Sequence, residues 1–159
     1  MSVFSSVYTV KSQLLSNFTT QLATSGLDGG PIQVSWGTPR VLQREAVVLG
    51  EVRTPPDQRW HQLGNLKRDE TYDLAVYIQA GDPRFDTQQE QTERVYVIAD
   101  VLATWLLTKT GATPGINLGG VPSGYQSLTG QIAVPDLDEW YDDGFVALLS
   151  SAVRVKARF

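Results

Sequence analysis

The sequence predicts an α+β fold with a mostly antiparallel sheet and two main helices packed on one face. Two segments repeat apolar residues every three or four positions, which is the period of an amphipathic helix. Other segments alternate apolar and polar residues, as half-buried strands do. The turns between these strands are short, so neighbouring strands should pair antiparallel. A chain of 159 residues fits one domain, and we expect residues 1–159 to form it.

The first predicted element is a helix near the N-terminus. Its buried stripe consists of Val7, Val10, Leu14, Phe18 and Leu22. Ser5 or Ser6 can cap its start, and Ser25-Gly26 ends it. We expect the opposite side to face water, with Lys11, Gln13, Asn17 and Gln21.

Three short strands are predicted next. Ile32, Val34 and Trp36 alternate with polar residues, and a second strand covers 46–52. Gly50 inside that strand predicts a bulge or a close backbone approach. The two prolines of the segment 54–57 predict a stiff turn, and a third strand is expected over 59–63, ended by a turn at 64–65.

The clearest strand covers 71–79 and is stopped by the sequence Gly81-Asp82-Pro83. One face of this strand is expected to be buried, with Tyr72, Leu74, Val76 and Ile78.

A long second helix is predicted from Thr87 to Thr110. Thr87 and Glu90 match a capping box, and Glu90 precedes Arg94 by four residues, the spacing of a helical ion pair. The predicted buried stripe is Val95, Ile98, Ala99, Leu102 and Leu106. Lys109 suits the helix C-terminus, and Gly111 can end the helix. The helix would be about 36 Å long, so its polar first turns could meet a neighbouring subunit.

The last third of the chain begins with a loop or short hairpin over 111–130, rich in Gly, Pro, Ser and Thr. A short strand is expected over 131–134 and an acidic turn over 135–144. The closing strand, 145–158, is apolar on both faces at its start, which predicts a central position in the sheet.

The composition offers little catalytic chemistry. The chain has no cysteine and one histidine, His61, so thiolate zinc sites and cysteine nucleophiles are excluded. The segment 120–124 lacks the spacing of a serine nucleophile elbow, and the acids between Asp136 and Asp143 fail the pattern of an EF-hand loop. We therefore predict no catalytic residue, no metal ligand and no cofactor. A net charge of −4 argues against general attraction to nucleic acid, and no apolar stretch is long enough to span a membrane.

The sequence favours a function based on protein contact surfaces over one based on catalysis. Basic residues gather around a tryptophan at Arg53, Arg59, Lys67 and Arg68. Aromatic and arginine side chains are common anchors of protein interfaces. The residues that we expect in an interface are Arg53, Arg59, Trp60, Glu90 and Arg94.

Several short patterns carry a resemblance to a known family. They are Trp60-His61-Gln62-Leu63-Gly64, Arg68-Asp69-Glu70, the turn 82–86, Glu93-Arg94-Val95-Tyr96, and the end of the chain from Val153 to Arg158. From about Gln33 onward, the chain resembles tail-terminator and related neck proteins of long-tailed bacteriophages, notably those infecting actinobacteria. The ends of the chain and the 111–130 loop carry no matching pattern.

The resemblance implies an α+β subunit of a ring, expected to be hexameric, at the head-proximal end of the tail tube. Such a ring ends tube polymerisation and joins the tube to the connector or stopper protein of the head. Genome DNA would pass its lumen without sequence-specific binding. The protein would be assembled in the host cytoplasm and located in the virion tail or neck, with no membrane partner.

Two alternatives remain open at this point. The protein could be a head-side connector, a stopper or another minor tail protein of the same particle. It could also be a small cytoplasmic enzyme or ligand-binding module, with a pocket beneath the 111–130 loop.

Overall fold

A computed structural model describes residues 6–53, 57–60, 68–81, 83–84, 86–132, 136–141 and 143–159, and for 57–60 and 68 it describes the backbone alone. The elements in chain order are α1 (Val7–Thr24), β1 (Gln33–Trp36), β2 (Ala46–Val52), β3 (Asp57–Trp60), β4 (Arg68–Ala80), α2 (Gln88–Leu106), the short 3-10 helix η1 (Gly115–Asn117), β5 (Ser127–Ile132), β6 (Asp136–Tyr141) and β7 (Phe145–Arg158). The α+β class is confirmed.

The centre of the sheet is the antiparallel pair β4 and β7, in register from Asp69 opposite Arg158 to Ala80 opposite Ala147. Among the described residues, each of these long strands has two shorter strands along its outer side. β2 and β3 follow one another along β4, and β5 and β6 follow one another along β7. The central position predicted for the closing strand is thus confirmed, with the predicted boundaries.

One strand pair departs from the antiparallel expectation: β1 lies parallel to β2. The chain between Trp36 and Ala46 must therefore return to the end of the sheet from which β1 started. Gln33 holds this return, because its side-chain amide donates to the Val41 carbonyl (3.1 Å) and its side-chain oxygen accepts from the Gln43 amide (2.9 Å). The Gln33 side chain thus stabilises the crossover between β1 and β2. The short connections in the sequence predict antiparallel pairing here instead.

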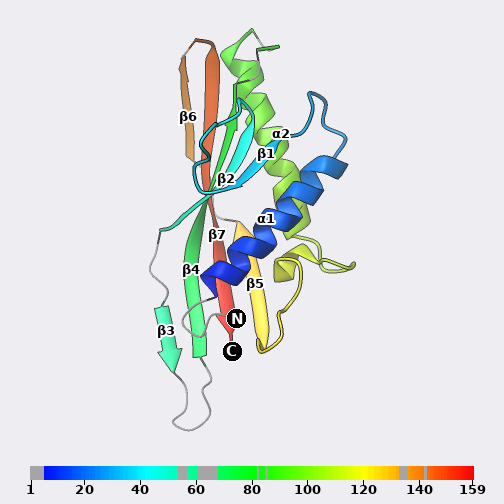
Figure 1. The fold of residues 1–159 in the computed structure, drawn as a ribbon, viewed down its shortest axis with the longest axis vertical. Helices are drawn as coiled ribbons and strands as arrows, with labels where there is room; N and C mark the ends of the chain where they lie inside the picture. Colours follow the sequence, from blue (N-terminus) through cyan, green and yellow to red (C-terminus); the bar gives the residue numbers. More distant parts are fainter. Residues whose placement is uncertain are drawn as a thin grey trace.

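Both helices cover the same face of the sheet (Figure 1), as predicted. The predicted stripe of α1 is buried from Val10 to Leu22, and so is the predicted stripe of α2. On β4, the expected face from Tyr72 to Ile78 lies against them. The helices meet where Phe18 packs edge-on against Trp105, with ring centroids 5.9 Å apart. No helix within the described residues has both the length and the apolar character needed to cross a membrane.

The polar side of α1 is not free in water, contrary to expectation. Lys11, Gln13, Asn17 and Gln21 are all half-buried. The loop after η1 lies against the middle of the helix, since the Gln13 side chain donates to the Gly120 carbonyl (3.0 Å) and Asn17 lies beside Gly119. The amphipathic pattern marks the apolar stripe correctly, but it carries no information about a distant polar loop that covers the rest.

The start of α1 is capped by a distant strand. Ser6 occupies the cap position, but its hydroxyl makes no cap hydrogen bond and instead lies 3.0 Å from the Tyr72 hydroxyl. The Ser6 amide donates to Glu70 (2.9 Å). Burial raises the pKa of Tyr72, because an ionised phenol would lose its hydration there.

The capping box of α2 is confirmed, but the end of the helix is not. Thr87 and Glu90 exchange the two expected hydrogen bonds, whereas the helix stops at Leu106 rather than Thr110. Thr108 causes the early stop: its hydroxyl donates to the Trp105 carbonyl (2.7 Å) and accepts from the Gly115 amide (2.9 Å). These bonds turn the chain back onto the helix before it reaches Lys109 and Gly111, where the sequence predicts its end.

Of the two features predicted at Gly50, the bulge is confirmed, and the close neighbour is a side chain rather than another backbone. The register between β2 and β4 shifts between Leu49 and Val52, which is a bulge. A Cβ atom at Gly50 would lie 2.6 Å from the Tyr77 ring, so a side chain at this position would collide with that ring.

The last third of the chain is more regular than predicted. β5 begins at Ser127, four residues before the predicted strand, and the expected acidic turn contains the strand β6. The physical reason is β7: its N-terminal half, from Phe145 to Ser150, needs a pairing partner on the side away from β4, and β6 supplies it. The predicted turn at 64–65, residue His61 and most of the predicted turn at 54–57 lie outside the described residues.

Candidate functional site

An aromatic group with basic neighbours lies at the β1 edge of the sheet. Tyr8 of α1 is 68% exposed and Trp36 of β1 is 42% exposed, with ring centroids 5.4 Å apart. The Lys11 ammonium lies 4.8 Å from the centroid of the Trp36 ring. Burial against these rings lowers the pKa of Lys11, and the Glu51 carboxylate opposes this effect. We define the β1-edge patch as the half-buried Lys11 together with the exposed residues on and beside this strand: Tyr8, Trp36, Arg40, Val41 and Leu42.

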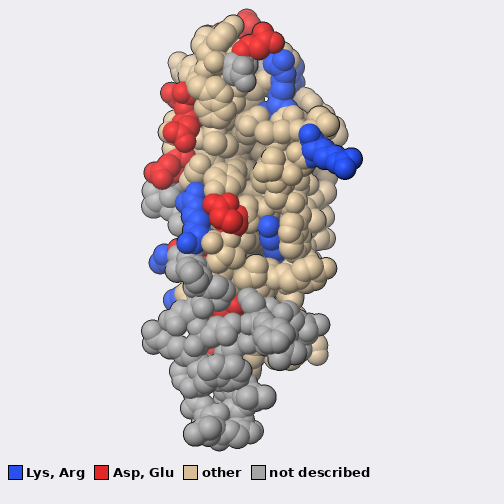
Figure 2. All heavy atoms as spheres, turned by 60° about the vertical axis from the view of Figure 1, so that its left-hand side comes forward, with Lys and Arg blue, Asp and Glu red and all other residues tan. Residues whose placement is uncertain are grey.

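The opposite edge of the sheet carries an acidic strand. All six residues of β6 are exposed, and this strand pairs with β7 alone among the described strands. Its carboxylates belong to Asp136, Asp138 and Glu139, and Glu139 accepts a hydrogen bond from Thr92 of α2. Trp140 and Tyr141 are 39% and 69% exposed. Figure 2 shows acidic side chains along one margin of the upper half of the molecule and basic ones toward the other margin.

Two arginine–aspartate pairs lie on the outer face of the sheet. Arg154 binds the two oxygens of Asp73 (2.8 and 3.0 Å), and Arg158 binds those of Asp69 (2.7 and 3.0 Å). The residues of each pair stand opposite each other on β4 and β7. Hydrogen bonds from Arg154 hold the pKa of Asp73 below its ordinary value.

The Asp73 pair predicts a specific acid sensitivity. A carboxyl whose pKa is lower in the folded protein contributes stability above its ordinary pKa, and this contribution is lost as the pH falls through the folded value. The Asp73→Asn variant should therefore lose less free energy of unfolding than the wild-type protein when the pH falls below about 4. Urea unfolding midpoints at pH 7 and in mild acid measure this, and an equal acid loss in both proteins would contradict it.

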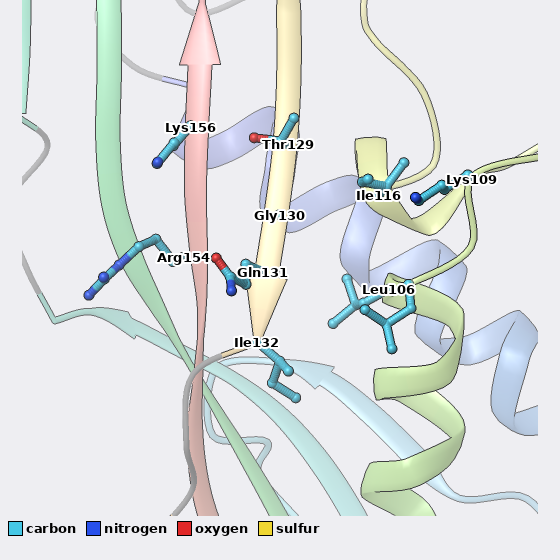
Figure 3. A pocket seen from close by; sticks show the side chains of 10 residues that line it. Leu106, Lys109, Ile116, Thr129, Gly130, Gln131, Ile132, Arg154 and Lys156 are labelled. Carbon is cyan, nitrogen blue, oxygen red and sulfur yellow. The ribbon is translucent and has the colours of Figure 1, made fainter.

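A cleft of about 430 Å³ runs along β5 beside the end of α2. In Figure 3, Leu106 of α2 and Ile132 of β5 lie on opposite sides of this space, and Arg154 and Lys156 of β7 also line it. The residues that line it include no histidine, serine or carboxylate. The cleft therefore lacks the serine, histidine and carboxylate of a Ser-His-Asp triad. Within the part of the chain that the structure describes, no three histidine or acidic residues are placed to hold a metal ion.

The five residues predicted for an interface are not brought together as one surface. Arg53 is exposed at the end of β2, with its guanidinium 5.7 Å from the Tyr77 ring, and Glu90 is exposed at the start of α2. Arg59 and Trp60 belong to β3, whose side chains are outside the described part. Arg94 is only 6% exposed.

Arg94 has a role inside the protomer, and the predicted pair with Glu90 is wrong. Its guanidinium binds Glu45 at the start of β2 (2.8 Å), the Asp28 carbonyl (2.7 Å) and the Asp28 carboxylate (3.3 Å). Arg84 lies 3.7 Å from both acids. Glu90 is occupied by the capping box and by the Asp86 amide. Arg94 thus joins α2, β2 and the loop after α1.

Sequence reasoning missed the β1-edge patch and the strand β6 as surfaces. A signal for β6 was present, because the run from Leu137 to Tyr141 includes three large apolar residues that a solvated turn does not require. The signal for the patch was weaker, since Tyr8 and Trp36 meet only after α1 folds onto β1.

No family model matches this chain, and no curated protein sequence does. Its fold is similar to that of a chain in the solved structure described as the virion of a native gene transfer agent (GTA) particle. The two chains are 13% identical, with a TM-score of 0.52, over 94% of this chain and 92% of the other. At this identity the likeness establishes a shared fold.

Proposed function

We propose that this chain is a structural protein of a phage-like virion and acts without catalysis. The observation that carries the proposal is the fold shared along nearly the whole length of a chain from a virion particle. The surfaces are consistent with this role. Exposed aromatic residues lie at two separate edges of the sheet, and the cleft beside β5 has no histidine, serine or carboxylate in its lining.

Within the virion, we propose that the protein forms a ring, expected to be hexameric, on the head-proximal end of the tail tube. The ring would end tube polymerisation and bind the head connector or stopper. The support for this finer role is the pattern of residues that resembles tail-terminator proteins, including Val153–Arg158 of β7 and Glu93–Tyr96 of α2. Genome DNA would pass through the lumen, where the net charge of −4 disfavours sticking.

Solution mass tests the proposal directly. Light scattering on the purified chain, alone and with the tail tube protein of the same particle, should give a closed oligomer of fixed mass. Locating the ring in a reconstruction of the particle then separates a tail terminator from a head-side stopper. A chain that stays monomeric under both conditions, with a small molecule bound in the cleft beside β5, would overturn the proposal in favour of a ligand-binding module.

A further inference from the structure

The described charges of this protomer fall into paired and unpaired sets. Asp69 and Asp73 on the outer face are bound by arginines, and so are Glu45 and Asp28 around Arg94. By contrast, Asp136 and Asp138 of β6 have no hydrogen-bond or ion-pair partner among the described residues. Arg40 beside β1 is likewise exposed and has no such partner within the described part of the protomer. Asp136 and Asp138 lie at one end of the strand order, and Arg40 lies beside the strand at the other end.

The strand order places these two sets at opposite edges of one sheet. Among the strands that the structure describes, β1 pairs with β2 alone and β6 pairs with β7 alone, and β4 lies between them. A closed ring of identical subunits needs a head-to-tail contact, in which two different patches meet and the rotation between neighbours closes. Patches on opposite edges of a sheet satisfy that requirement, whereas two patches on the same edge favour a two-fold dimer.

Each edge also has aromatic side chains that could anchor a contact. Tyr8 and Trp36 are exposed in the β1-edge patch, and Trp140 and Tyr141 are exposed on β6. Large aromatic residues dominate the energy of protein interfaces, while charged residues at the rim determine orientation and exclude wrong partners. An exposed edge strand, in addition, offers unpaired backbone groups to another chain. Both edges thus combine anchors with charges, and the charges have opposite sign.

We infer that β6 of one copy binds the β1-edge patch of the next copy, with Asp136 and Asp138 facing Arg40 and Lys11. This inference rests on the proposed ring and names the surfaces that form it. The cleft beside β5 is the competing site for β6, since Lys109 and apolar side chains line it. However, β5 and β6 lie along the same side of β7, so that contact would produce a closed pair rather than a ring.

The absence of cysteine from the chain allows a direct test by cross-linking. The double variant Arg40→Cys/Asp138→Cys, treated with a short bismaleimide in the presence of tube protein, should form a covalent ladder up to the full ring. The single variants should stay uncoupled, and mixing them should give only dimers. Coupling of Asp138→Cys to itself would indicate a two-fold contact and would overturn the inference.

Charge reversal provides the second test. Asp136→Lys/Asp138→Lys and Lys11→Glu/Arg40→Glu should each raise the protein concentration for half-assembly at least about tenfold, because like charges then face each other. Mixing the two variants should restore assembly between unlike copies. The matched control is Asp100→Lys, an exposed acid of α2 away from both edges, which should assemble normally.

The outcomes separate this contact from the ring itself. Suppose that both charge variants assemble at the wild-type concentration and that no cross-linked ladder forms. This result would contradict the inferred contact but not the proposed ring. The acids of β6 would then serve to keep an exposed edge soluble. A wild-type chain that never assembles, alone or with tube protein, would remove both proposals.

Discussion

Replacing Arg94 with leucine is expected to destabilise the folded protein by about 3 to 5 kcal/mol. Arg94 is nearly buried, and the carboxylate that it binds, Glu45, has a side chain only 12% exposed. Removing the guanidinium leaves this carboxylate without its closest cation and leaves the Asp28 carbonyl without its donor. Urea unfolding followed by tryptophan fluorescence measures the loss, at one protein concentration because association shifts apparent stability.

Two further variants make this prediction specific. Arg84 approaches the same two acids but is 43% exposed, so Arg84→Gln should cost less than about 1 kcal/mol. The double variant Glu45→Leu/Arg94→Leu should recover much of the loss, since it also removes the half-buried carboxylate that Arg94 binds. If Arg94→Leu cost no more than Arg84→Gln, the buried pair would not have the role that its geometry indicates.

Local patterns predicted most of the framework, because the forces that they report act within a few residues. The stripe from Val10 to Leu22 and the capping box at Thr87 and Glu90 depend on spacing along one helix. The boundaries of β7 follow from its apolar composition and were predicted without error. In each case the deciding interaction is close in sequence or is simple burial of an apolar face.

Features that depend on distant partners were not predictable in the same way. Arg94 has an acid four residues before it, yet it binds Glu45, 49 residues away. The acidic sequence of β6 is typical of a solvated turn. Its strand structure depends on pairing with the N-terminal half of β7, which is distant information that the local pattern does not contain. The parallel β1 depends on the hydrogen bonds of Gln33 to the loop beyond it. The candidate surfaces belong to this class, since each joins residues from separate elements or an edge defined by strand order.

Replacing Gly115 with alanine is expected to destabilise the protein by about 3 kcal/mol. Gly115 is buried at the start of η1, and a Cβ atom there would collide with the backbone of Trp105 and lie 2.8 Å from the Leu106 Cα. Backbone atoms at the end of α2 cannot move aside as a flexible side chain would. The substitution must therefore push η1 away from the helix, at the cost of the Gly115–Thr108 hydrogen bond and the bond from the Trp105 indole to the Thr113 carbonyl (3.1 Å).

Gly81→Ala is the matched control for this collision. A Cβ atom at Gly81 would have its nearest neighbour, a methyl group of Val146, at 3.6 Å, an ordinary contact distance. Its free energy of unfolding should therefore stay within about 0.5 kcal/mol of the wild-type value. Because both substitutions add the same methyl group, the difference between them isolates the close approach of η1 to α2. Equal effects would show that η1 can move away from the helix without penalty, and the early end of α2 at Leu106 would then not depend on this contact.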